Sequence, residues 1–387
     1  MISRSEIMTL ERAARGVPTL SVYLDGSAPD PAARRAWRKR LDRALHTLRG
    51  RLGGEHDAER RAFDRAVAHL ESRLPDRMRA VGAPGWVGFA SADGVRYAEA
   101  LPVAMPTLVR WRPGVHVAPL VRALKEDRPV LVAVVTHRDA RLYRYHRGAL
   151  ESLDHLRAVA PSAELSRARG GARPRLHPGV RGATGADESD RQRRALLDDL
   201  SRDVTRALAA RAGADGWIVV GGSPLAAKAI VRAFPARLAD RVMATASLAE
   251  GATPAEIAAA AARAAATLRG ARDRQTVARL LEDAGAGKLA TAGARDTARA
   301  LEQGAVEMLL VSHGMLQRRP DRAEALLHAA IAQDAHVEDV SGVAAARLDA
   351  ECGGVCARLR FAPAVLSEGA EPVAEHAHLV VAGQRGA

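Results

Sequence analysis

GAVEMLLVS, residues 304–312, is the stretch that decides the fold of this 387-residue chain. Its branched and aliphatic side chains predict a buried strand, and a helical pattern over 296–302 precedes it. A helix over 321–333, a strand over 336–340, a helix over 343–349 and a last strand over 355–361, within GGVCARLRF, follow it. This alternation predicts a small three-layer α/β fold.

The beginning of the chain predicts another α/β unit. Expected are an amphipathic helix over 4–15, a strand over 19–24, helices from about Pro31 and over 56–74, and a hairpin over 86–98. The helix after Pro31 is rich in arginine, which is compatible with a phosphate-binding face and more typical of a solvated one.

The middle of the chain opens with a polar joint at 125–129, before VLVAVV at 130–135. That continuous apolar run predicts a strand buried on both faces. Strands over 141–145 and 149–153 complete a meander, followed by a helix over 188–210, a strand over 217–220, a helix over 224–234 and a strand over 241–243. These elements predict an α/β unit with a mixed sheet. Between the strand over 217–220 and the helix over 224–234, Gly221-Gly222-Ser223 is more typical of a tight turn in which Ser223 caps the helix than of an anion-binding site.

A helix start joins this unit to the last one. In Thr253-Pro254-Ala255-Glu256, threonine and glutamate form a capping box around a proline in the first turn, so a long alanine-rich helix is expected up to about Asp283. The chain therefore divides into three predicted domains, at 1–125, 126–270 and 271–387.

Composition narrows the classes of function. The formal net charge is +13, almost wholly from arginine, and arginine pairs well with phosphate, so RNA is the favoured partner. No apolar run approaches the roughly 18 residues of a membrane span, and the cytosol is the expected location. The spacing of Cys352 and Cys356 fits neither a redox motif nor a zinc site, so two buried thiols, no metal and no cofactor are expected.

The chain resembles the bacterial members of the archaeo-eukaryotic release factor superfamily, relatives of class I peptide chain release factors and of Pelota. The strand SVYLD at 21–25, the meander over 130–153, and residues 304–312 with Gly353-Gly354 carry the resemblance. It implies a central RNase H-like domain with a mixed sheet and a C-terminal domain like those of kink-turn-binding ribosomal proteins. It also implies action at the ribosome.

Release factors act through a Gly-Gly-Gln loop, whose glycines let the backbone approach RNA and whose glutamine helps place a water at the ester of peptidyl-tRNA. The equivalent loop here spans 158–187, and its candidate catalytic residues are Gly170, Gly171 and Gln192. Gly170-Gly171 is followed by Ala172, and Gln192 falls on a predicted helix, where a surface role is the competing interpretation. The candidate RNA-binding residues are Arg167, Arg169, Arg173, Arg175, Arg181, Arg191 and Arg193.

These features predict a ribosome-associated protein that contacts the large subunit, tRNA and rRNA, and that hydrolyses peptidyl-tRNA on stalled ribosomes. One alternative is a non-catalytic, Pelota-like rescue factor that works with a partner ATPase or GTPase through the C-terminal domain. A second alternative is an RNA-binding protein or nuclease that is independent of the ribosome.

Overall fold

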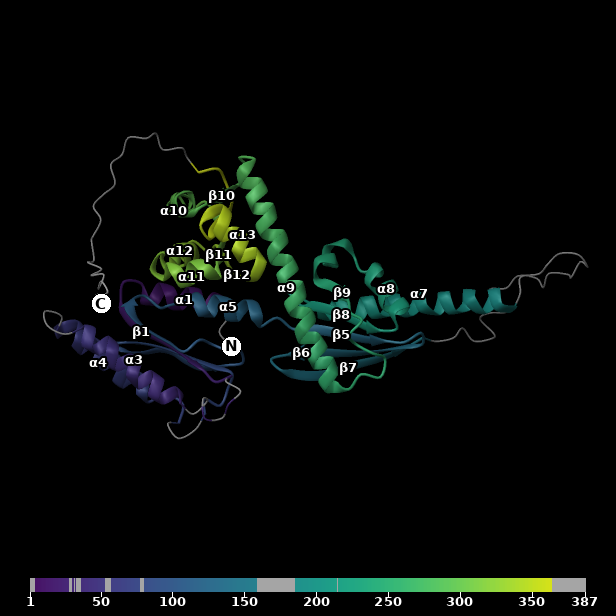
Figure 1. Cartoon of the computed structure of the whole chain (residues 1–387), viewed down its shortest axis with the longest axis horizontal. Coiled ribbons are helices and arrows are strands. Elements are labelled where there is room, and N and C mark those ends of the chain that lie inside the picture. Colours follow the sequence, from purple (N-terminus) through teal and green to yellow (C-terminus); the bar gives the residue numbers. More distant parts are fainter. Residues whose placement is uncertain are drawn as a thin grey trace, which may run out of the picture.

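The structure is a computed structural model, and it describes residues 4–27, 30, 32, 36–52, 57–76, 80–158, 185–213 and 215–363, without the side chains of 4, 185–190 and 192. Three sheets with helices packed on them make up this part of the chain (Figure 1), which confirms the α/β class. Within the described residues, no helix combines the length and the apolar character needed to cross a membrane.

The first sheet is antiparallel and has the strand order β3-β2-β1-β4. Its strands are β1 (Pro18–Asp25), β2 (Gly85–Ser91), β3 (Gly94–Leu101) and β4 (Leu108–Pro113), and its helices are α1 (Arg4–Ala14), α3 (Trp37–Arg51), α4 (Asp57–Glu71) and α5 (Ala118–Glu126). Leu20, Val22 and Leu24 alternate along β1 and pack against Trp37 of α3 and Phe63 of α4. The helix expected from about Pro31 is described from Trp37 onward.

The last sheet has the order β10-β13-β11-β12, with β11 parallel to β12 and antiparallel to β13. Its elements are β10 (Ala290–Ala292), α10 (Ala294–Glu302), β11 (Val306–Ser312), α11 (His313–Arg318), α12 (Pro320–Ala332), β12 (His336–Val340), α13 (Gly342–Cys352) and β13 (Val355–Leu359). Leu310 faces α13, whereas Leu309 and Val311 face α10 and α12, so the predicted three layers are confirmed. Cys356 lies in this core, where burial raises the pKa of its thiol, and Cys352 is half-buried.

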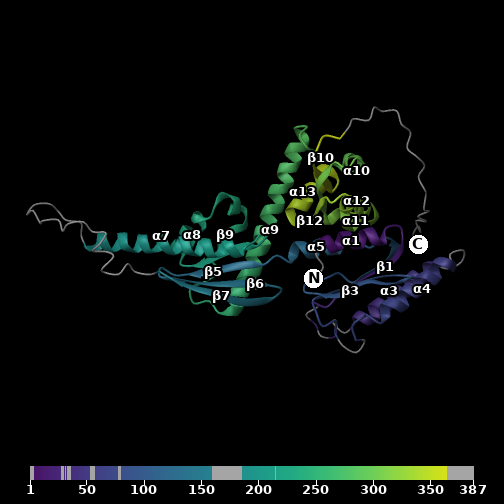
Figure 2. The same ribbon diagram turned by 180° about the vertical axis from the view of Figure 1, so that it is seen from behind.

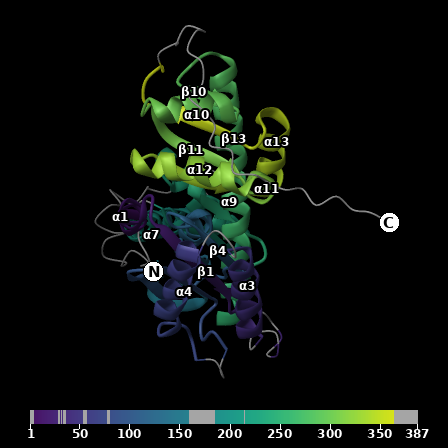
Figure 3. The same ribbon diagram turned by 90° about the vertical axis from the view of Figure 1, so that its left-hand side faces the viewer.

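The first and last sheets, with their helices, share one apolar core. Ile7 of α1, Tyr23 of β1 and Leu120 of α5 belong to the same buried cluster as Leu309 and Leu327 of the last sheet and its helix α12. Figures 1 and 3 show the last unit stacked on the first one, with α1 at the seam between them. These units, called the N–C body below, therefore pack as one body.

The middle sheet has the order β7-β6-β5-β8-β9 and lies beside the N–C body (Figures 1 and 2). Its elements are β5 (Val130–Val135), β6 (Asp139–His146), β7 (Ala149–Arg157), α7 (Gly185–Arg211), β8 (Trp217–Gly222), α8 (Pro224–Ala233), the 3-10 helix η1 (Ala236–Arg241) and β9 (Val242–Ala244). β5 runs antiparallel to β6 and parallel to β8, so the sheet is mixed as predicted. Leu131 and Ala133 face α7 and α8, and Val130 and Val132 face the opposite side.

Helix α9 (Pro254–Gly285) covers that opposite side and then continues onto the last sheet. Its 32 residues correspond to a length of about 48 Å. The predicted capping box is present: Glu256 N–H donates to Thr253 Oγ1 at 3.4 Å, and Thr253 N–H donates to Glu256 Oε2 at 2.8 Å. One helix therefore joins the central unit to the N–C body.

Candidate functional site

The candidate site is the end of the central sheet where β7 stops and beyond which the first half of α7 projects, called the distal end below. The β5–β6 turn builds it: Thr136 Oγ1 accepts hydrogen bonds from the backbone N–H groups of Arg138 (3.1 Å) and Asp139 (3.0 Å). Ala158 N–H, just after β7, donates to Arg138 O at 2.7 Å. The last described residue before the long connecting segment, 159–184, is therefore fixed to this turn.

The carboxyl ends of the parallel strands β5 and β8 lie at the same end. Gly222 has a φ of 99°, and a Cβ added to it would lie 2.1 Å from Val135 O, so only glycine allows this close approach. Ser223 follows at the N-cap position of α8, as predicted, but its hydroxyl makes no capping bond and instead contacts His137 Nε2 at 3.4 Å. A nucleophilic site would also require a group that orients the histidine.

Exposed cations surround the distal end. Helix α7 has 27 residues, about 40 Å, and its first half extends beyond the sheet (Figure 1). The described exposed basic residues here are His137, Arg138, His155, Arg157, Arg191, Arg193 and Arg194. His155 contacts Asp139 at 3.6 Å. This arrangement offers phosphate-binding side chains on both sides of the connecting segment.

The predicted site residues fall into two groups. Arg191 and Arg193 are exposed on α7, and the backbone of Gln192 is helical, as the sequence indicates. Its side chain lies outside the described residues, as do the remaining candidates Arg167, Arg169, Gly170, Gly171, Arg173, Arg175 and Arg181. In the described part of the chain, no group of three His, Cys, Asp or Glu residues is arranged to hold a metal ion.

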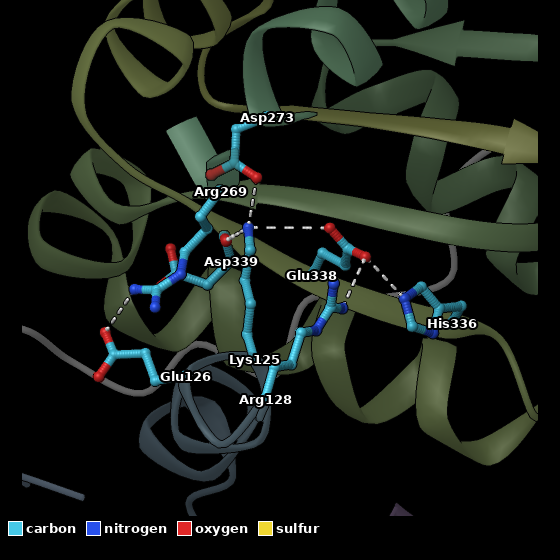
Figure 4. Close-up of polar contacts among 8 residues, drawn as sticks. All are labelled: Lys125, Glu126, Arg128, Arg269, Asp273, His336, Glu338 and Asp339. Atoms are coloured by element: carbon cyan, nitrogen blue, oxygen red, sulfur yellow. Dashed lines mark hydrogen bonds and ion pairs between the residues drawn. The ribbon is translucent and has the colours of Figure 1, made fainter. Parts of the chain in front are cut away.

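A second polar arrangement lies far from the distal end, where α5, α9 and β12 meet (Figure 4). Lys125 Nζ is 2.7 Å from Asp273 Oδ1, 2.5 Å from the backbone oxygen of Asp339 and 3.7 Å from Glu338 Oε2. Glu338 also pairs with His336 at 2.9 Å and with Arg128 at 3.9 Å. These residues, Lys125, Arg128, Asp273, His336, Glu338 and Asp339, are called the junction cluster below.

Burial and charge act against each other in the junction cluster. Burial opposes ionisation of Glu338, but the hydrogen bond with His336 and the charges of Lys125 and Arg128 prevail and lower its pKa to about 2. At Asp273, burial prevails over the attraction of Lys125 and raises the pKa. Burial also raises the pKa of Asp339, whose Oδ1 has no hydrogen-bond partner. The cluster thus binds three elements together without satisfying every buried polar atom.

A cleft of about 690 Å³ lies beside this cluster, between the first sheet with α5 and the helix α11. Apolar side chains such as Met105, Leu108 and Leu316 line most of it, and Arg122 lies 3.5 Å from His313 among its polar groups. Its walls come from both halves of the N–C body. It offers space for binding, with Ser27, His116 and His313 among its polar lining residues.

The central mixed sheet, with the long segment between β7 and α7, is the part of the chain that matches a known family. Residues 116–266 match the model described as bacterial archaeo-eukaryotic release factor family 10. Over these residues the chain is therefore similar to this family, and the predicted resemblance to the bacterial family is confirmed there.

Several solved structures show a weak likeness to the chain. Archaeoglobus fulgidus Pelota is 17% identical, over 72% of this chain and 80% of that chain, with a TM-score of 0.38. Archaeal Pelota, in a model of its ribosome-bound form with ABCE1, is 15% identical over 93% and 94%, with a TM-score of 0.40. The archaeal translation termination factor aRF1 is 18% identical over 93% and 99%, with a TM-score of 0.25. No protein with a curated description matches the chain.

Proposed function

We propose that the protein is a ribosome-associated release-factor-like protein that acts at the large subunit. The observation that carries the proposal is the family match over 116–266, which includes the segment 159–184 and both elements that flank it. The elements that flank this segment, β7 and α7, carry exposed arginines at the distal end. Cationic side chains favour contact with rRNA and tRNA phosphates, which would direct this end of the central unit toward RNA.

The reaction that we propose is hydrolysis of peptidyl-tRNA on stalled ribosomes. Gly170 and Gly171 would let the backbone of the segment approach the ester, Gln192 would help place the attacking water, and the arginines between 167 and 193 would hold the surrounding RNA phosphates. No metal or cofactor takes part in this proposal.

The second candidate is a non-catalytic, Pelota-like rescue factor. One observation favours it: Gly170-Gly171 is followed by Ala172, so the Gly-Gly-Gln triplet is absent in its strict form. In this case the protein would bind the ribosome and recruit a partner ATPase or GTPase through residues 271–387. The domain boundaries after residues 125 and 270 belong to the same proposal.

Peptide release distinguishes the two candidates. Large subunits that carry labelled peptidyl-tRNA would be mixed with the wild type, with Gln192→Ala and with a variant that lacks residues 170–185. Release by the wild type that is lost on deletion would establish a hydrolase, and loss in Gln192→Ala would assign the glutamine. Binding without release would establish the rescue factor.

Co-sedimentation tests the part that both candidates share. The wild type is expected in ribosomal fractions at low salt, and Arg191→Gln with Arg193→Gln is expected to weaken that association. Failure of the wild type to enter ribosomal fractions, even at low salt, would contradict both candidates and leave a ribosome-independent RNA-binding protein or nuclease.

A further inference from the structure

Two separate apolar clusters fix the two halves of α9. The first half, up to Leu268, packs with Val132 and Trp217 in the core of the central unit. The second half, from Val277 onward, packs with Leu310 and Leu348 in the core of the last sheet. The halves are therefore bound to different bodies by apolar contacts, and each half must follow its own body if the two bodies move.

Polar contacts hold the stretch between these anchors. From 269 to 276, Asp273 is the single buried residue of the helix, and its partner is the buried ammonium group of Lys125. Arg128, on the other connection between the bodies, lies 5.6 Å from the Trp217 ring of the central unit and 3.9 Å from Glu338 of the N–C body. Incompletely satisfied ionic contacts open more readily than a continuous apolar core, because water can replace their partners.

A glycine lies in this same stretch. A Cβ added to Gly270 would meet a single neighbouring atom within 4 Å, Arg274 Nη1 at 3.5 Å, so packing does not require glycine there. Glycine weakens a helix interior because its backbone has more conformational freedom to lose. Beside it is a cavity of about 270 Å³ between α9 and the start of α13, lined by Gly270, Asp273 and Val343 among others. The helix thus has a weak point next to unfilled space.

We propose that α9 bends at Gly270, so that the central unit turns relative to the N–C body, and that the Lys125–Asp273 ion pair holds the straight form. A bend at Gly270 lies between the two apolar anchors, so it breaks no apolar contact of either anchor. It is independent of the proposed ribosomal function, because it concerns the free protein in solution.

The test measures distances between the two bodies. Spin labels would be attached at Ala233→Cys in α8 and Ala346→Cys in α13, both exposed positions, in a Cys352→Ala background with Cys356 buried. Pulsed electron resonance then gives the distribution of distances between the labels. Gly270→Ala is expected to narrow this distribution, and Lys125→Met with Asp273→Leu to broaden it or shift its mean.

Matched variants control for helix propensity and for the loss of an ion pair. Gly50→Ala in α3 adds a Cβ that meets no atom within 4 Å, and Lys288→Met with Asp283→Leu removes an ion pair 3.1 Å long beyond the second anchor. Both should leave the distances unchanged, with melting temperatures showing that every variant is folded. If Gly270→Ala leaves the distribution as wide as in the wild type, or acts no differently from Gly50→Ala, the bend is not at this residue and the proposal fails.

Discussion

At the residue scale, a half-buried histidine joins the two halves of the N–C body. His328 of α12 lies 2.5 Å from Glu11 of α1 and 3.5 Å from Glu324, whose other contacts are His116 (3.2 Å) and the Val117 N–H (2.5 Å). Burial disfavours the imidazolium, yet contact with the two carboxylates prevails and raises the pKa of His328 to about 9. Likewise, the two histidines outweigh the burial of Glu324 and lower its pKa to about 2.

This raised pKa predicts how stability depends on pH. An imidazolium that is favoured in the folded state contributes its full stabilisation below the unfolded pKa of about 6.5, and loses it as pH rises through about 9. As pH rises from 6.5 to 9, the urea concentration at the midpoint of unfolding should therefore decrease, by an amount that corresponds to a loss of about 1–3 kcal/mol in the free energy of unfolding. His328→Gln should be less stable at pH 6.5 and show a flatter profile.

His46→Gln provides the control, because His46 is exposed on α3. It should keep the profile of the wild type. A wild type and a His328→Gln variant that lose equal stability between pH 6.5 and 9 would show that His328 does not hold the two halves together.

At the element scale, the N-terminus of α9 depends on one cap. Thr253→Ala removes the hydroxyl that accepts from Glu256 N–H, which leaves a donor in the first turn without its partner. The variant is expected to lose about 1 kcal/mol of unfolding free energy, measured by urea denaturation. Thr253→Ser should retain most of it, because serine caps as well as threonine, and equal losses in both variants would argue against the cap.

Elements with strong local signals were the ones that could be predicted. The apolar run at 130–135 indicates β5, and Thr253 with Glu256 indicates where α9 begins. Sequence patterns did not predict β4, α5, β10 and α11. β4 alternates Arg110, Trp111 and Arg112 on a half-exposed strand, α5 contains a proline, and β10 and α11 are short, so their local patterns are weak.

Contacts between distant parts of the chain could not be predicted in this way. The polar joint at 125–129 gives no sign that Lys125 is buried, because its partners Asp273 and Glu338 are remote in sequence. The shared core of the N–C body has the same origin: the apolar face of α1 is visible in the sequence, but not that it packs against α12. For the candidate site, the cationic residues of α7 follow from composition, whereas the contact between Ser223 and His137 needs the register of β5 and β8.

At the scale of the whole molecule, the charge of +13 predicts that the proposed binding to ribosomes weakens steeply with salt. The slope of log affinity against log salt is negative, and each lost phosphate contact makes it shallower by roughly 0.7–0.9, because fewer counterions are released on binding. Replacing Arg191, Arg193 and Arg194 by glutamine should therefore make the slope shallower by up to about 2–3. Sedimentation with ribosomes at salt concentrations from about 50 to about 200 mM would measure it.

A control variant separates the effect of where the positive charge lies from the effect of how much charge is removed. Arg43, Arg51 and Arg65 are exposed on α3 and α4, on the N–C body, so replacing these three by glutamine removes the same charge far from the distal end. If the distal end contacts RNA, the α7 variant should change the slope more than this control does. Equal slopes in the two variants would mean that net charge attracts the protein to RNA without a defined contact at α7, and the distal end would then lose its role in the proposed function.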